Sequence, residues 1–275
     1  MMKPLLRAAA ALLATAAFAL PARATTYSTD YTDLWYNPNE SGWGVNFIQQ
    51  GNVIFATLFV YGVGNVPQWF TASDMEPSPA GSQTTFTGQL FQTSGPYFAA
   101  GSFDPNQVTR NTVGTMTVVF TSPSTATLQY TVNGATVTKS ISRQTWRSDN
   151  LAGNYLGGLT ATGSGCSQVP NGPILIFGAL AAQQSGTQVT MNVSFTSNQG
   201  QASQCTFSGP LTQTGHLSSV AGSWNCTING GAANSGTFTV SGIASSVNGF
   251  NGRFTGRDQF CTYDGYFGGV RDVPQ

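Results

Sequence analysis

The sequence predicts an all-β protein built from two consecutive antiparallel, up-and-down β-barrels. Short runs rich in Val, Ile, Thr, Phe, Tyr and Trp alternate with turns of Gly, Asn, Ser and Pro from Tyr27 onward, and no stretch shows the apolar period of a helix. Each half of the chain holds about eight such runs in about 120 residues, which is enough for a sheet to close into a small barrel. Aromatic residues crowd the first half, whereas all four cysteines lie in the second. We therefore expect two barrels of different composition.

A leader segment precedes the first barrel. Met1 to Arg7 is basic, Ala8 to Leu20 is an apolar run, and Ala22-Arg23-Ala24 has the small-residue pattern of a cleavage site. This order is typical of a secretory signal peptide over residues 1–24, cleaved after Ala24. The apolar run is too short to span a membrane, so we expect a secreted or periplasmic protein without membrane insertion.

The first barrel is expected over residues 25–148. Its strands are predicted near residues 33–37, 43–50, 52–61, 66–73, 84–92, 112–120, 125–132 and 135–143. Asn133-Gly134 is the clearest turn, because this dipeptide accepts the positive φ angles of a two-residue hairpin. The strand at 52–61 is apolar on both faces, as expected of a barrel wall covered by another subunit or domain.

The second barrel is expected over residues 149–275. Its strands are predicted near residues 152–161, 173–182, 187–195, 203–211, 218–227, 235–243, 248–256 and 261–270. The boundary is placed near Ser148, because the segment 143–150 (RQTWRSDN) is polar and lacks the alternation of a strand. We expect the two halves to fold as separate barrels.

Two disulfides are expected in the second barrel. An even number of cysteines in an exported chain favours disulfides, and the spacings are far wider than the close pairs of a zinc site, so no metal is expected. Cys205 and Cys226 lie symmetrically about the predicted turn at Gly215-His216, so they would face each other across one hairpin. The first and last strands of a closed barrel are neighbours, which would pair Cys166 with Cys261.

The low charge of the chain restricts its partners. Only 7% of the 275 residues are charged, the 10 basic residues balance the 10 acidic ones, and His occurs once. Without a run of Lys or Arg the chain has no electrostatic footprint for nucleic acid. No phosphate-binding loop, nucleophile elbow or HExxH pattern occurs, so no cofactor is predicted. We expect an unknown ligand or protein partner recognised by shape and uncharged polarity, or a homo-oligomer.

Catalysis would have to rest on very few residues. His216 is the sole imidazole and lies in a predicted turn far from any acid in the sequence, so we expect a solvated turn histidine and not a general base. Hydrolysis of a glycosidic bond would need two carboxylates, for which Glu40 is the leading candidate. Its candidate partners are Asp33, Asp74 and Glu76. The competing interpretation is that these acids belong to loops and turns.

One segment, DLWYNPNESGWGVNF at residues 33–47, stands out because it encloses a carboxylate, two Asn and a Ser between two Trp residues. In one interpretation these polar groups hold a tight turn and the aromatic side chains fill the end of the barrel. In the other, polar groups ringed by aromatic side chains bind a neutral polar ligand such as a sugar. The candidate ligand-binding residues are Trp35, Asn37, Glu40, Ser41, Trp43 and Trp69.

Several runs of the first half share their order and spacing with a known group of proteins. They are WYNPNESGWGVNFIQQGNVIFATLFVYG, PQWFTAS, FTGQLFQTSGPYF, VGTMTVVF and LQYTVNGATVTKSISRQTW. In these runs the chain resembles exported bacterial proteins that carry an NPxESGWG repeat, and its ending GRFTGRDQFCTYDGYFGGVRD is similar to C-terminal modules of some of them. The resemblance implies export and a β-rich module. The group has no established activity, so it implies no reaction.

A shorter motif, Trp35-Tyr36-Asn37 with Ser41 four residues after the Asn, is similar to the first barrel strand of avidin-like proteins. In that family the Asn and the Ser bind the ureido head of the ligand. The resemblance implies that Asn37 and Ser41 contact a biotin-like ligand in a small barrel of the lipocalin and avidin kind.

Three functions remain open. The leading expectation is an exported, non-catalytic binding or surface-interaction protein, because low charge, a single His and many Ser, Thr, Asn and Gln side chains suit capture of a neutral polar ligand such as a glycan. The first alternative is a structural, self-assembling extracellular protein. The second is a carbohydrate-active hydrolase that uses Glu40.

Overall fold

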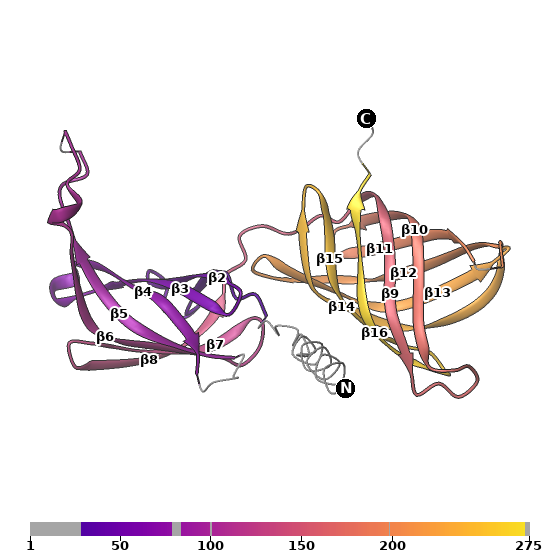
Figure 1. The fold of residues 1–275 in the computed structure, drawn as a ribbon, viewed down its shortest axis with the longest axis horizontal. Helices are drawn as coiled ribbons and strands as arrows, with labels where there is room; N and C mark the ends of the chain where they lie inside the picture. Colours follow the sequence, from indigo (N-terminus) through magenta and orange to yellow (C-terminus); the bar gives the residue numbers. More distant parts are fainter. Residues whose placement is uncertain (1–28, 79–83, 100, 198, 273–275) are drawn as a thin grey trace, which may run out of the picture.

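The computed structural model describes residues 29–78, 84–99, 101–197 and 199–272. It contains two closed antiparallel barrels of eight strands each, which follow one another along the chain (Figure 1). The predicted fold class is therefore confirmed. The signal peptide expected over residues 1–24 lies outside the described residues.

In the first barrel every strand pairs with its neighbour in sequence, and β1 pairs with β8 to close the sheet. The strands are β1 (Asp33–Tyr36), β2 (Gly44–Gln50), β3 (Val53–Tyr61), β4 (Pro67–Pro77), β5 (Thr85–Ser94), β6 (Thr109–Phe120), β7 (Thr125–Val132) and β8 (Ala135–Arg143). Two short 3₁₀ turns, η1 (Val63–Asn65) and η2 (Pro105–Gln107), lie in the β3–β4 and β5–β6 connections. Within the described residues no helix has the length and hydrophobicity needed to cross a membrane.

The second barrel has the same order, and β9 pairs with both β10 and β16 to close it. Its strands are β9 (Gly153–Ser164), β10 (Gly172–Ser185), β11 (Gln188–Thr196), β12 (Ala202–Thr214), β13 (Leu217–Ile228), β14 (Gly231–Ser246), β15 (Gly249–Arg257) and β16 (Thr262–Arg271). The segment between Arg143 and Gly153 joins the barrels and contains the boundary predicted near Ser148.

Alternation along the strands decides which side chains fill the barrels. On β3, Ile54, Ala56 and Leu58 are fully buried, whereas Phe55 and Phe59 point outward and are 38% and 48% exposed. The barrel interiors are rich in aromatic side chains. The largest rings inside the first barrel are Trp35, Phe47, Phe70 and Phe86, and those inside the second are Phe207, Phe254 and Phe267.

Strand β14 is longer than the alternation of the sequence indicates. It extends through Ser246, and its pairing with β15 shifts register between Ser241 and Ala244. Gly242 lies in this bulge at a φ of 58°, a conformation that glycine accepts without strain. The bulge interrupts the alternation of inward and outward side chains. The alternation visible in the sequence therefore ends before β14 does.

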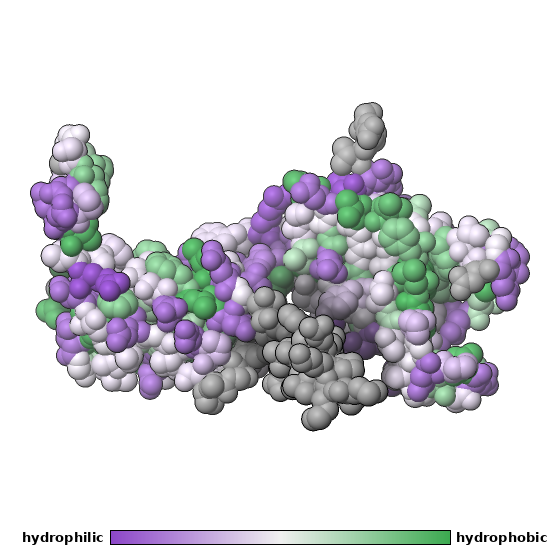
Figure 2. Space-filling view, viewed as in Figure 1, coloured by the Kyte–Doolittle hydropathy of each residue, from purple (hydrophilic) through white to green (hydrophobic). Residues whose placement is uncertain are grey.

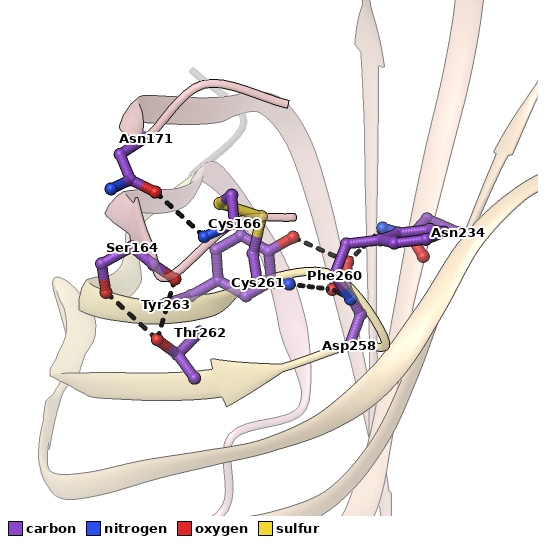
Figure 3. The surroundings of a disulfide bond; sticks show 9 residues. All are labelled: Ser164, Cys166, Asn171, Asn234, Asp258, Phe260, Cys261, Thr262 and Tyr263. Atoms are coloured by element: carbon purple, nitrogen blue, oxygen red, sulfur yellow. Dashed lines mark hydrogen bonds between the residues drawn. A yellow bond between two sulfur atoms is a disulfide. The ribbon is translucent and has the colours of Figure 1, made fainter. Parts of the chain in front are cut away.

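Both cysteine pairs of the second barrel lie at disulfide-bonding distance. The Cα atoms are 4.2 Å apart in the Cys166–Cys261 pair and 4.0 Å apart in the Cys205–Cys226 pair. Cys205 and Cys226 are direct partners across the β12–β13 hairpin, whereas the other pair joins the loop after β9 to the residue before β16 (Figure 3). These are the pairings that the hairpin and closure arguments predict.

Candidate functional site

The loop between β1 and β2 carries the NPNESGWG motif and forms a tight turn. The Asn37 carbonyl accepts a hydrogen bond from the Glu40 amide at 3.0 Å, and Asn37 Oδ1 accepts one from the Asn39 amide at 2.9 Å. Gly42 follows at a φ of 118°, which favours glycine. The side chain of Asn37 therefore helps to hold the turn, in the way that Asn commonly does.

Glu40 anchors this loop to the last strand of the barrel. Its two carboxylate oxygens lie 2.8 and 2.9 Å from Nζ of Lys139 on β8, and Trp43 Nε1 donates a hydrogen bond to Oε2 at 3.1 Å. The hydrogen bond from Lys139, together with that from Trp43, lowers the pKa of Glu40 below its usual value. Glu40 is therefore an ionised carboxylate at neutral pH and not a proton donor.

The six predicted binding residues do not share one face of the barrel. Trp35 is fully buried in the interior, where its Nε1 donates to the Tyr31 carbonyl at 3.0 Å. Ser41 is exposed in the motif loop, and Trp69 is 50% exposed on the outer face of β4. Asn37, Glu40, Ser41 and Trp43 thus lie together in the loop, Trp69 lies on the outside of the barrel and Trp35 belongs to the core.

Three exposed rings, Phe59, Tyr61 and Trp69, form what we call the aromatic platform. Phe59 and Trp69 are direct partners across β3 and β4, and Tyr61 lies on the same outer face of β3 as Phe59. The Tyr61 hydroxyl donates to the Gly42 carbonyl at 3.0 Å, which ties the platform to the motif loop. A shallow hollow of about 190 Å³ lies among the platform residues, Gly42 and Gln68.

Uncharged polar side chains lie beside the platform. Asn46, Thr57 and Thr71 form the neighbouring cross-strand row on the outer face of β2, β3 and β4. Their amide and hydroxyl groups offer both donors and acceptors. An aromatic surface bordered by neutral polar groups suits a ligand that has apolar faces as well as hydroxyl groups.

Of the three platform residues, only Trp69 is among the candidates predicted from the sequence; Phe59 and Tyr61 are not. A signal for both was present in the apolar alternation of residues 53–61, since one of two apolar faces must point outward when a barrel closes. The alternation does not identify the neighbour across the strand, because the register that places Phe59 beside Trp69 depends on the β3–β4 pairing.

A second polar cluster joins the two barrels. Nδ1 of His216, in the β12–β13 turn, lies 2.6 Å from Asp33 Oδ2, and its Nε2 lies 3.1 Å from Asp30 Oδ2. Arg143, buried at the end of β8, lies 3.4 Å from the same Asp33 oxygen. The hydrogen bonds to Asp30 and to Asp33 raise the pKa of His216 to about 9.

This contact changes the interpretation of His216. The sequence indicates a solvated turn histidine because no acid is near it in the chain, whereas both acids reach it from the other barrel. Each ring nitrogen faces a carboxylate, so the imidazolium form is stabilised and neither nitrogen is free to accept a proton from a nucleophile. We therefore assign His216 a role in joining the barrels.

None of the protein-family models matches this chain, and neither a curated protein nor a solved structure gives a significant match to it.

Proposed function

We propose that this chain is an exported, non-catalytic binding protein that captures a neutral polar ligand, such as a glycan, on the aromatic platform. The observation that carries the proposal is the exposure of Phe59, Tyr61 and Trp69 together on one outer face, tied to the motif loop through Tyr61 and Gly42. Large rings are seldom left in water in such a group without a partner. The two disulfides favour an oxidising compartment, so we propose that the mature protein begins after Ala24 and is secreted or periplasmic.

The chemistry of the platform favours a sugar over a charged ligand. The C–H faces of a pyranose pack on aromatic rings, and its hydroxyls need donors and acceptors of the kind that Asn46, Thr57 and Thr71 supply. Lys139 and Glu40, which meet at the motif loop, neutralise each other's charge. The platform therefore offers stacking and neutral hydrogen bonds and no net charge to select an ionic group.

The hydrolase alternative is the less favoured one. A glycosidase acid must be protonated in the resting enzyme, which usually requires a raised pKa. The pKa of Glu40 is lowered by Lys139, and its carboxylate is occupied by Lys139 and Trp43. The geometry at Glu40 favours an anchor for the loop.

Tryptophan fluorescence tests the proposal. The mature protein is titrated with neutral oligosaccharides, glycan polymers and biotin, the last because of the resemblance of Trp35-Tyr36-Asn37 to avidin-like proteins. We expect a saturable change with a glycan that Trp69→Ala abolishes. Trp146→Ala is the matched control, since Trp146 is 73% exposed but lies in the segment between the barrels. A response that survives in Trp69→Ala, or none to any glycan, would overturn the proposed site.

Self-assembly is the second candidate, because further apolar side chains lie on the outer faces of both barrels. Ile48 and Phe55 are exposed on the first barrel, and Leu175 and Phe177 on β10 of the second. Figure 2 shows a strip of hydrophobic residues over β9 and β10. A sedimentation mass above that of the monomer, reduced by Leu175→Ser, would support this function. A monomer at every concentration would exclude it.

A further inference from the structure

The connection between β5 and β6 carries two exposed aromatic side chains beyond the first barrel. It leaves the sheet where Ser94 pairs with Thr109, and Figure 1 shows it projecting from the barrel on the side away from the second barrel. Tyr97 and Phe98 are 68% and 89% exposed, and their ring centroids are 4.8 Å apart. We call these two rings the aromatic knob. Two adjacent rings left in water on a projecting loop are typical of a contact with a partner.

The loop that carries the knob offers apolar contact and no free charge. Asp104 is the only charged residue in the segment 95–108. Its carboxylate accepts hydrogen bonds from the backbone and side-chain amides of Asn106 at 3.0 Å each, and from Nε2 of Gln107 at 3.3 Å. The acid therefore holds η2, and the knob itself suits an apolar partner surface.

An apolar cavity lies at the end of the second barrel that is remote from the first barrel. The β12–β13 turn with His216 contacts the first barrel, and the cavity lies at the opposite end, where β13 ends and β14 begins. Ile174 and Ile176 line the cavity and are only partly buried, so it is open to solvent beside β10. The other apolar walls are formed by Leu159, Phe207, Trp224 and Phe254.

This cavity has the size of one aromatic ring. An apolar cavity of about 150 Å³ lined by Leu, Ile and Phe holds one benzene molecule. The cavity in the second barrel has a volume of about 170 Å³, so it has room for the phenyl ring of Phe98. Its walls expose almost only apolar atoms, which a phenyl ring matches and a polar group does not.

The knob and the cavity of one chain cannot meet. The knob projects from the first barrel away from the second (Figure 1), and the cavity lies at the end of the second barrel that does not contact the first. The contacts of His216 with Asp30 and Asp33 hold the barrels in this order. A knob can therefore reach only the cavity of another copy. A contact between two different surfaces of identical chains leaves one of each free, so it propagates head to tail.

We propose that mature chains associate head to tail, with the Phe98 ring of one copy in the second-barrel cavity of the next copy. The contact is centred on one ring, so the association is weak and depends on concentration. It uses neither the aromatic platform nor the hydrophobic strip over β9 and β10. It therefore does not depend on glycan capture or on self-assembly through that strip.

Sedimentation velocity of the mature protein over a wide range of concentrations tests the proposal. We expect the mass to rise beyond that of a dimer, because every added copy leaves a free knob and a free cavity. Phe98→Ser should weaken the association by about tenfold or more, since burial of one Phe side chain is lost. Val63→Ser is the matched control and should leave the association unchanged, because Val63 is fully exposed in η1, outside the knob.

A variant on the cavity side allows a mixing experiment. Ile174→Trp fills the cavity and should weaken the association as Phe98→Ser does, whereas Leu175→Trp adds the same side chain at the neighbouring outward position and should not. Phe98→Ser keeps the cavity and Ile174→Trp keeps the knob. Each should be monomeric alone, and their mixture should form a one-to-one dimer that cannot grow. Phe98→Ser and Val63→Ser change only exposed side chains, so they decide the matter should Ile174→Trp fail to fold.

Three results would overturn the proposal. The first is a monomer at every concentration. The second is association that persists unchanged in Phe98→Ser, because the contact would then lie elsewhere, and its loss in Leu175→Ser would place it on the strip over β9 and β10. The third is the absence of a dimer when folded Phe98→Ser and Ile174→Trp are mixed.

Discussion

Trp35 and Trp69 are the same side chain in opposite environments. Trp35 points into the barrel, is fully buried and packs against Phe47 and Phe120 at centroid distances of 6.0 and 5.2 Å. Trp69 points outward and is half-exposed. The parity of a residue along its strand decides whether an aromatic ring stabilises the fold or is available to a ligand.

The contribution of an inward-facing ring to stability is most easily measured at Phe120. It is 3% exposed and contacts Tyr31, Trp35, Phe47 and Phe86. We expect Phe120→Ala to lower the free energy of unfolding by about 3–5 kcal/mol, because it removes a buried ring and leaves a cavity. Urea denaturation followed by near-ultraviolet circular dichroism measures the change.

The control for this prediction is Phe55→Ala on the outer face of β3, where Phe55 is 38% exposed. This change should reduce the free energy of unfolding by less than about 1 kcal/mol. Similar losses at the two positions would contradict the assignment of inward and outward faces.

At the scale of the elements, the backbones of neighbouring strands in the second barrel approach each other closely at glycines. Gly158 on β9 lies between Phe177 on β10 and Gly268 on β16, and its φ is 149°. A Cβ at this position would lie 1.9 Å from the Ile176 carbonyl oxygen. The barrel can close at this point because no side chain separates the strands.

We therefore expect Gly158→Ala to destabilise the second barrel by at least about 2 kcal/mol, because the methyl group clashes with backbone and the φ angle disfavours Ala. Gly172→Ala on β10 is the matched control, since a Cβ there would meet nothing within 4 Å. It should change the free energy of unfolding by less than about 0.5 kcal/mol. Thermal unfolding of the two variants compares them, and equal melting temperatures would contradict the close approach.

The strands and both cysteine pairings could be predicted from the sequence, because alternation, turn residues and hairpin symmetry are local signals. The sequence predicts the motif as one group of residues. It does not predict that Trp35 enters the core while the other motif residues stay in the loop, because that depends on the register of β1. The contact of His216 with Asp30 and Asp33 could not be predicted either. Its partners are 186 and 183 residues away and lie in the other barrel.

At the scale of the whole molecule, this contact is an ionic link between the barrels. Burial by itself would raise the pKa of Asp30, but hydrogen bonds from His216 and Thr32 lower it to about 2. The pKa of His216 is raised to about 9 by Asp30 and Asp33. Charged forms of both partners therefore coexist across the neutral range.

The link should make stability depend on pH. Because the folded pKa of His216 is about 9 and its ordinary value is 6.5, its contribution is complete below pH 6.5 and is lost as the pH rises through about 9. At the acid side, the contribution of Asp30 is complete above its ordinary pKa of 3.8 and is lost as the pH falls through about 2. The alkaline loss should be about 1 kcal/mol, since solvent screens a side chain that is 37% exposed.

Urea unfolding at pH 6 and at pH 10 measures this loss, with His216→Gln as the comparison. The variant should lack the part of the alkaline decrease that comes from His216. An identical decrease in both proteins would show that His216 does not link the barrels energetically.

Binding to insoluble polysaccharides is a direct measure of whether the aromatic platform captures a glycan. The mature protein is mixed with suspensions of cellulose, chitin and peptidoglycan, and the protein left in solution is measured as a binding isotherm. We predict saturable binding to at least one polymer. The affinity should fall tenfold or more, which corresponds to about 1.4 kcal/mol, in a Phe59→Ala/Trp69→Ala variant, and it should be unchanged in Trp146→Ala. Binding that is equal in all three proteins, or absent from all polymers, would contradict the claim.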